Sequence, residues 1–340
     1  MNNIFSTANE YKTLFNKGLA TLAQDKSLGT FILAMANATF SNEVYAVTKD
    51  YLQQNFNHLK QKYIDDFSEG RKVNEVDEDL LVFLKMLCVG FDNLKTTLLR
   101  DESGWELQFN HLRGFRPNRI TQLQIDNLVL PFSAAGFNFN KPFMAKERLW
   151  EGEYNNRQLS LYYNKYPFAH YHTLLVPERE KGLPQFLEFE LHEYMWELIS
   201  VIAENIAGAG IGYNSRGAFS SVNHLHFQFF IRDEPLPVMR EQWLHNGGTV
   251  TYPTTCEVFT SLAESRNYLE HLHNTNTAYN LLYTPGRLYC FPRNMQGSYK
   301  HAEWTPGFSW YELSGGILTA NHDSFTAITA ADIENEFNLL

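Results

Sequence analysis

The residues best suited to chemistry form one short run, His224-Leu225-His226-Phe227-Gln228. Residues 222–231 are rich in Val, Phe and Ile, which predicts a β-strand. On a strand, successive side chains alternate between two faces, so His224, His226 and Gln228 would share one face. Leu225 and Phe227 would point the other way, into the core. Two imidazoles and an amide in a row favour a reactive site, because a solvated strand face more usually carries Thr, Lys or Glu.

Three interpretations of this polar face remain open. Two imidazoles two residues apart can chelate zinc or iron, with Asp233 or Glu234 as third ligand, but glutamine is a poor ligand for these metals. Alternatively, a histidine can attack a phosphorus centre and form a covalent intermediate, while the neutral amide of Gln228 donates to a phosphoryl oxygen. The third interpretation is a pair of structural, hydrogen-bonded core histidines.

The run resembles the H-x-H-x-Q signature of one branch of the histidine-triad superfamily. That branch holds galactose-1-phosphate uridylyltransferases, diadenosine polyphosphate phosphorylases and GDP-hexose phosphorylases. Residues 212–228 look particularly like the GDP-L-galactose and GDP-D-glucose phosphorylases. Further similar segments follow in the same order along the chain: QFNHLRGFRP (108–117), FNFNK (137–141), LYYNKYPFAHYHTLLVP (161–177), LYCFPR (288–293) and WYELSGG (310–316). The resemblance runs from about residue 105 to 320.

The sequence departs from the family pattern at two places. Tyr171 stands where a glycine usually precedes the histidine that opens the second strand. Residues 164–167 look somewhat more like the diadenosine polyphosphate enzymes. These departures bear on the substrate and leave the reaction class as the resemblance implies.

The resemblance implies that His226 attacks the α-phosphorus of a nucleotide and forms a nucleotidyl-histidine. Gln228 would bind a nonbridging oxygen, and His224 would fix the hydrogen bonding of the loop. The implied reaction is phosphorolysis of a GDP-hexose to GDP and hexose 1-phosphate, with inorganic phosphate as co-substrate and no cofactor or metal. One alternative is a diadenosine tetraphosphate phosphorylase (ATP adenylyltransferase), and another is a metal-dependent enzyme that uses the His-x-His strand.

The matched segments also supply candidates for binding the substrate. Asn164 resembles a ribose-contacting position, Ser221 a phosphate-contacting one, and His172 would abut the nucleophile strand. Each has a simpler interpretation: a loop cap for Asn164, a turn residue for Ser221 and a structural role for His172. Positive charge for phosphate would come from side chains that are otherwise solvated surface cations. The candidate cations are Arg113, Arg116, Lys141, Lys165 and Arg216. Asn214 is a further candidate for binding the substrate.

The elements that would position these residues follow from periodicity. Apolar spacings of three and four predict helices from about residue 9 to 99, with Gly70 as a stop and Asp77 as a cap. Strands are predicted over 105–109, 128–132, 159–163, 172–176, 211–214, 222–231, 279–283 and 287–291. Helices are predicted over 187–206, 262–273 and 330–339. His271 and His273, two apart on a helix, would point to different sides and cannot act together.

Strands and helices come in runs without strict alternation, which favours an α+β fold with a largely antiparallel sheet. The resemblance implies a histidine-triad-like form of it, with helices flanking the sheet. We therefore expect a helical N-terminal region over 1–100 and a nucleotidyltransferase/phosphorylase domain over 101–340.

The composition excludes several classes of protein. The 340-residue chain carries a formal charge of −10, so nonspecific binding to nucleic acid or an anionic membrane is not expected. No apolar run reaches the length of a membrane span. Three scattered cysteines, Cys88, Cys256 and Cys290, suggest neither a disulfide framework nor a zinc pair. We expect a cytoplasmic protein whose partner is a nucleotide sugar or dinucleoside polyphosphate, with a homodimer left open.

Overall fold

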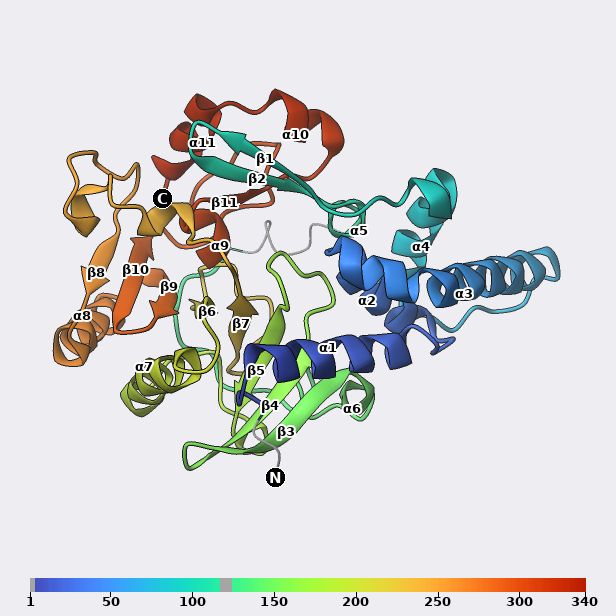
Figure 1. Cartoon of the computed structure of the whole chain (residues 1–340), viewed down its shortest axis with the longest axis horizontal. Helices are drawn as coiled ribbons and strands as arrows, with labels where there is room; N and C mark the ends of the chain where they lie inside the picture. The colour runs from blue at the N-terminus through green and yellow to red at the C-terminus, as the bar shows by residue number, and fades with distance from the viewer. Residues whose placement is uncertain (1–3, 117–123) are drawn as a thin grey trace.

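The computed structural model describes residues 4–116 and 124–340. Its centre is an eight-stranded sheet with the strand order β3-β4-β5-β7-β6-β9-β10-β8, shown in Figure 1. Within the described residues, every pair of neighbouring strands in this sheet is antiparallel. The strands are β3 (Arg148–Tyr154), β4 (Arg157–Tyr163), β5 (Thr173–Pro177), β6 (Ala209–Asn214), β7 (Phe227–Ile231), β8 (Glu257–Phe259), β9 (Ala278–Thr284) and β10 (Arg287–Arg293). The predicted α+β class with a mainly antiparallel sheet is confirmed.

A second, three-stranded sheet packs beside the first with the order β1-β2-β11. β1 (Leu98–Glu102) pairs antiparallel with β2 (Trp105–Phe109), and β11 (Gly316–Leu318) pairs parallel with β2. Figure 1 shows the C-terminal helices gathered around this small sheet. They are α9 (Trp310–Leu313), α10 (His322–Ala327) and α11 (Ala330–Phe337). The C-terminal part of the chain thus returns to the segment that follows the N-terminal helices.

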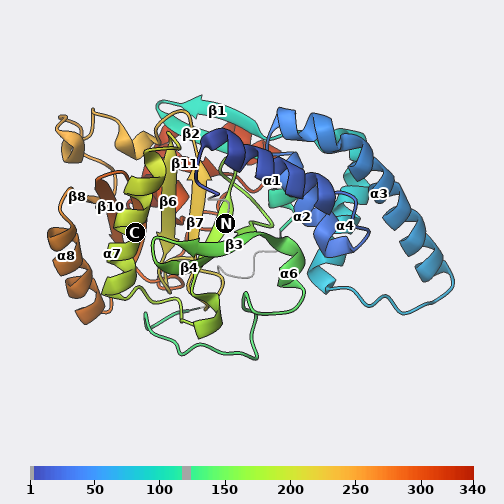
Figure 2. The ribbon, with the colours of Figure 1, turned by 60° about the horizontal axis from the view of Figure 1, so that its bottom comes forward.

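The N-terminal region is helical, as predicted. It contains α1 (Ala8–Leu22), α2 (Leu28–Ala38), α3 (Asn42–Ser68) and α4 (Asp77–Val89), and Figure 2 shows α2, α3 and α4 extending to one side of the sheet. Asp77 is the first residue of α4, and the capping position is Val76. Gly70 follows the end of α3 with φ 64°, which suits a helix stop.

These helices share the main hydrophobic core with the large sheet. Phe5 and Tyr11 place their rings 5.3 and 5.2 Å from that of Phe229 on β7. The hydroxyl of Tyr163 on β4 donates to the carbonyl of Phe15 at 2.7 Å. Residues 5–15, at the start of the N-terminal region, are therefore packed directly against the sheet that carries the predicted nucleophile.

The remaining helices are short or flank the large sheet. α7 (Phe189–Ala203) and α8 (Leu262–Asn274) confirm two predicted helices, while α5 (His111–Gly114) and α6 (Met144–Glu147) are single turns. The described residues also contain four 3₁₀ turns, which are Phe91–Asn93, Arg179–Lys181, Pro237–Met239 and Leu244–Asn246. Across the described residues, no helix has the length and apolar character needed to cross a membrane.

Two predicted strands need correction. Residues 128–132 form no strand, because side chains take their backbone groups: Asn276 accepts from the amide of Leu128, and Asn223 donates to the carbonyls of Leu130 and Pro131. The strand predicted over 222–231 begins only at Phe227. His224 and His226 therefore lie in the irregular segment that leads into β7.

Candidate functional site

His226 lies directly before β7 and exposes 6% of its surface. Its Nδ1–H donates to the carbonyl of His224 at 2.9 Å, so the lone pair of the neutral ring lies on Nε2. Among the described residues, Nε2 has no hydrogen-bond partner. Burial lowers the pKa of His226 to about 4, against a partly opposing hydrogen bond to the His224 backbone. The ring is therefore neutral at pH 7, with a lone pair available for attack.

The backbone of His226 is held by a residue that sequence reasoning missed. The Gln185 side chain accepts from the His226 amide at 2.9 Å and donates to the His226 carbonyl at 3.1 Å. The same amide nitrogen donates to the carbonyl of Asn214 at 2.9 Å. Gln185 thus takes the place of a neighbouring strand, which explains why the strand is shorter than predicted. Its distance from His226 along the sequence gave no local signal for this role.

We expect Gln185→Leu to lower the free energy of unfolding by about 3–5 kcal/mol, because a side chain of similar size would leave several buried backbone groups unsatisfied. Urea unfolding measures the change. The exposed Gln54 on α3 provides a matched control, Gln54→Leu, with little expected effect. A loss of less than about 1 kcal/mol for Gln185→Leu would contradict the bridging role.

The alternation of faces predicted for this run is preserved despite the shorter strand. Leu225 and Phe227 belong to the main core beneath the sheet. On the other side, the Phe139 ring lies 5.4 Å from His224 and 5.5 Å from His226. The Phe139 amide donates to Nδ1 of His224 at 3.1 Å. His224 therefore fastens the 137–141 segment over the nucleophile and is itself fully buried.

Gln228 and His172 form a second hydrogen-bonded pair on the same face. The amide of Phe168 donates to Nδ1 of His172 at 3.3 Å, so the proton of the neutral ring lies on Nε2. That Nε2–H donates to Oε1 of Gln228 at 3.0 Å. Burial, and then the charge of Arg113, lower the pKa of His172 to about 3. His172 thus fixes which end of the Gln228 amide accepts, and leaves the NH₂ group available for a ligand.

Asn164 lies at the edge of this pair, with its Nδ2 3.3 Å from Nε2 of His172. Its Oδ1 accepts from the amide of Tyr166 at 3.1 Å, which is the loop-capping contact of the simpler interpretation.

Tyr171 adopts φ 51°, in the left-handed region that favours glycine. This backbone geometry gives a physical reason for the glycine that usually occupies the position in similar sequences.

Arg113 is the predicted cation that reaches this pair, through its contact with the ring of Phe168. It donates to the carbonyl of Tyr166 at 2.9 Å, and its guanidinium lies 4.7 Å from the ring of Phe168. The Phe168 ring is in turn 4.4 Å from that of His172. Burial lowers the pKa of Arg113 to about 10, so it remains charged at pH 7. Within the described residues no carboxylate lies at ion-pair distance from it, and the nearby buried carboxylate of Glu312 partly offsets its charge.

The other predicted cations make contacts within the protein. Lys165 forms an ion pair with Asp79 of α4 at 2.6 Å, and Lys141 donates to the carbonyls of residues 134 and 135. Arg216 donates to the carbonyl of Asn127, and Arg116 lies 5.7 Å from the ring of Tyr166. The structure therefore brings Arg113 to the histidine pair, places Arg116 beside Tyr166 close to it, and engages Lys141, Lys165 and Arg216 elsewhere.

Asn214 and Ser221 differ in their surroundings. Asn214 is 5% exposed, and its Oδ1 accepts from the side chain of Asn280 at 2.7 Å and from the amide of Trp310 at 3.0 Å. It therefore ties the end of β6 to α9. Ser221 is exposed in the segment before His224, where its hydroxyl is available to a ligand.

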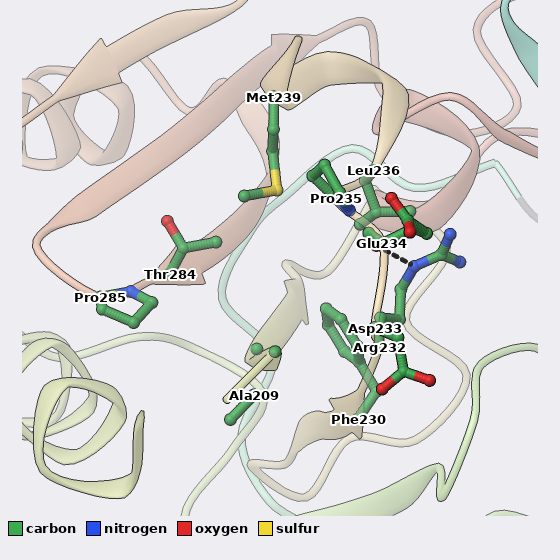
Figure 3. A pocket seen from close by; sticks show the side chains of 12 residues that line it. Ala209, Phe230, Arg232, Asp233, Glu234, Pro235, Leu236, Met239, Thr284 and Pro285 are labelled. Carbon is green, nitrogen blue, oxygen red and sulfur yellow. Dashed lines mark hydrogen bonds between the residues drawn. The ribbon is translucent and has the colours of Figure 1, made fainter. Parts of the chain in front are cut away.

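The carboxylates considered as metal ligands lie away from the histidines. Figure 3 shows Asp233 and Glu234 at a pocket of about 270 Å³, where β6 begins and β7 ends. His226 lies at the opposite end of β7. Across residues 4–116 and 124–340, no group of three His, Cys, Asp or Glu side chains is arranged to hold a metal ion. The metal interpretation therefore lacks its third ligand in the part of the chain that the structure describes.

The low pKa of His226 predicts that its ring does not titrate in the usual range. A histidine in an unfolded chain takes up its proton near pH 6.5, whereas buried His226 is expected to stay neutral to about pH 5. Folding stability contributed by this shift is present above pH 6.5 and is lost as the pH falls toward about 4. NMR titration of the ring, assigned with His226→Asn, measures the pKa. A midpoint near 6.5 would contradict the buried, neutral state.

Comparison with known proteins places this geometry in context. Residues 86–230 match the family model described as the GDPGP1-like N-terminal domain. GDP-D-glucose phosphorylase 1 of Danio rerio is 34% identical over 148 residues, which cover 43% of this chain and 42% of that protein. GDP-L-galactose phosphorylase 2 of Arabidopsis thaliana is 25% identical over 243 residues, covering 60% of this chain and 56% of the relative. The chain thus spans about half the length of these relatives.

Among solved structures, yeast Ap4A phosphorylase Apa2 in complex with AMP aligns with a TM-score of 0.49 and 14% identity. The alignment covers 78% of this chain and 97% of the yeast protein. The resemblance to GDP-hexose phosphorylases, first seen in the histidine run, is confirmed by the sequence comparisons, and residues 86–230 match the N-terminal domain of GDPGP1-like proteins.

Proposed function

We propose that this protein is a GDP-hexose phosphorylase that acts through a covalent nucleotidyl-histidine on His226. The observation that carries the proposal is the state of the His226 ring. Its Nδ1 proton is held by the carbonyl of His224, and Nε2 has no partner among the described residues. The similarity of residues 86–230 to GDP-hexose phosphorylases supports the choice of substrate class.

The proposed reaction has two displacements at the α-phosphorus. Nε2 of His226 attacks this phosphorus, the bond to the oxygen bridging to the β-phosphorus breaks, and hexose 1-phosphate leaves. Inorganic phosphate then attacks the same phosphorus, the bond to Nε2 breaks, and GDP is released. Covalent catalysis of this kind divides one difficult displacement into two easier ones.

The surrounding residues support each displacement. The Gln228 NH₂ group, oriented by His172, donates to a nonbridging oxygen on which charge builds up. Arg113 supplies a buried positive charge beside the same pair. Neither displacement requires a metal or cofactor, so we expect activity to survive exhaustive chelation. A homodimer remains a prediction.

The direct experiment is to incubate the purified protein with candidate substrates, with and without inorganic phosphate, and to resolve the nucleotide products by chromatography. GDP-glucose, GDP-galactose, UDP-glucose and diadenosine tetraphosphate are the substrates to compare. Phosphate-dependent release of GDP from a GDP-hexose is the expected result. ADP and ATP from the dinucleotide, with no turnover of GDP-hexoses, would instead favour the alternative reaction. Activity lost on chelation and restored by a metal would contradict the mechanism.

A further inference from the structure

Trp310 brings a C-terminal element to the site, outside the matched residues 86–230. It is the first residue of α9 and is fully buried. The amide of Trp310 donates to Oδ1 of Asn214 at 3.0 Å, and a capping box between Ser309 and Glu312 fixes the start of the turn. The position of the indole is thus set by β6.

The indole lies on the polar face of the sheet, beside Gln228. Gly212 of β6 is the direct partner of Gln228 on β7. A Cβ atom on Gly212 would lie 2.6 Å from Nε1 of Trp310 and closer still to two other indole atoms, so only glycine fits there. Cβ positions of directly paired residues are about 5 Å apart, which places Nε1 within about 8 Å of the Gln228 Cβ.

Three other aromatic side chains define the position of the indole further. Phe230, which follows Gln228 on the same face, stacks against Trp310 with ring centroids 5.1 Å apart and planes 17° from parallel. Phe168, the neighbour of His172, lies 5.8 Å from the indole. Tyr311 lies 5.5 Å away, nearly perpendicular to it. Packing against these rings therefore holds the indole near the Gln228–His172 pair.

The indole nitrogen has no hydrogen-bond partner within the described residues, although it is buried. A buried donor without a partner is unfavourable, and native proteins retain few of them. Trp243 shows the usual arrangement in the same protein, since its Nε1 donates to the carbonyl of Pro237 at 2.7 Å. An unsatisfied donor beside Gln228 is best explained by a partner that arrives with the substrate.

We propose that Nε1–H of Trp310 donates to a nonbridging oxygen of the α-phosphoryl group, alongside the Gln228 amide. This inference rests on the proposed function and adds a second neutral donor to the site of nucleotidyl transfer. Trp310 is fully buried, and His226 and Gln228 are only 6% and 7% exposed, so the three groups lie in a largely closed part of the protein. Neutral donors in such a site stabilise developing charge more effectively than in water.

The test compares kcat and KM for GDP-hexose phosphorolysis in two matched variants. Trp310→Phe is expected to lower kcat by about 10- to 100-fold with a smaller change in KM, because the donor acts most strongly in the transition state. Trp243→Phe removes another indole from the same hydrophobic cluster, together with its hydrogen bond to the Pro237 carbonyl, and is expected to keep wild-type kcat. Similar losses in melting temperature would show that packing costs are matched.

A third variant removes the donor without changing the packing. Incorporation of 3-benzothienylalanine at position 310 places sulfur where the indole has N–H, and we expect the same loss of kcat. Wild-type kcat in this variant would overturn the proposal, as would an equal loss of kcat in Trp243→Phe. Absence of any GDP release by the wild-type protein would overturn the proposed function, and this role with it, independently of the variants.

Discussion

Replacing His226 with Asn is expected to lower GDP-hexose phosphorolysis by more than about 1,000-fold, because the variant has no nucleophile for the first displacement. Asn can still accept and donate hydrogen bonds in the buried site, and the backbone contacts to Gln185 do not depend on the imidazole. GDP binding should therefore stay within a few-fold of wild type. Steady-state kinetics and isothermal titration calorimetry measure the two quantities.

Intact-protein mass spectrometry gives a direct view of the intermediate. Wild-type protein incubated with GDP-hexose without phosphate should gain the mass of one GMP group, and His226→Asn should gain none. His271→Asn, at an exposed position on α8, is the matched control and should label normally. Retention of more than about 3% of activity by His226→Asn would overturn its assignment as nucleophile.

The sequence pattern correctly predicted the face of the sheet on which each side chain of the histidine run lies, but it placed the start of the strand wrongly. Leu225 and Phe227 are in the core, and His226 and Gln228 are on the opposite face, as the alternation indicates. The strand boundary was wrong because Gln185, about forty residues upstream, takes the backbone hydrogen bonds that a neighbouring strand would otherwise make. A contact between residues so far apart leaves no periodic signal.

Contacts between residues far apart in the sequence also determine which of the predicted cations are available to the substrate. Lys165 lies in a segment that resembles a substrate-binding loop, but its ammonium pairs with Asp79, a residue of the N-terminal helices. Asn37 of α2 also donates to the carbonyl of Asn164 at 2.8 Å. The sequence predicted that residues 1–100 are helical but could not show that they hold this loop. A resemblance that begins near residue 105 contains no information about contacts with the region before it.

The segment that contains Trp310 could be recognised in the sequence, but the role of Trp310 could not. The WYELSGG segment is recognisable in the sequence, whereas the close approach of its indole to Gly212 depends on tertiary packing. Gly212 itself belongs to the similar segment that precedes the histidines. Only the structure joins the two segments, through the β6–β7 register that pairs Gly212 with Gln228.

Substituting Gln228 with Glu is expected to lower kcat for phosphorolysis by about 100- to 1,000-fold, since it replaces a neutral donor with a carboxylate beside the phosphoryl oxygens. His172 Nε2–H would still donate to one carboxylate oxygen, so the local packing should persist. The second oxygen would then face the ligand as an acceptor and repel it. The rate of GMP labelling of His226, measured by rapid quench, should fall in parallel with kcat.

A control variant shows whether the added negative charge alone, at any position, lowers kcat. Gln158→Glu makes the same substitution at an exposed position on β4 and should leave kcat within about two-fold of wild type. If Gln228→Glu labels His226 at the wild-type rate, then the amide does not contact the phosphoryl group. If labelling is fast but GDP release is slow, then Gln228 assists only the attack of phosphate on the intermediate. The expected parallel loss requires its NH₂ group in both displacements, because the same phosphorus carries the charge in each.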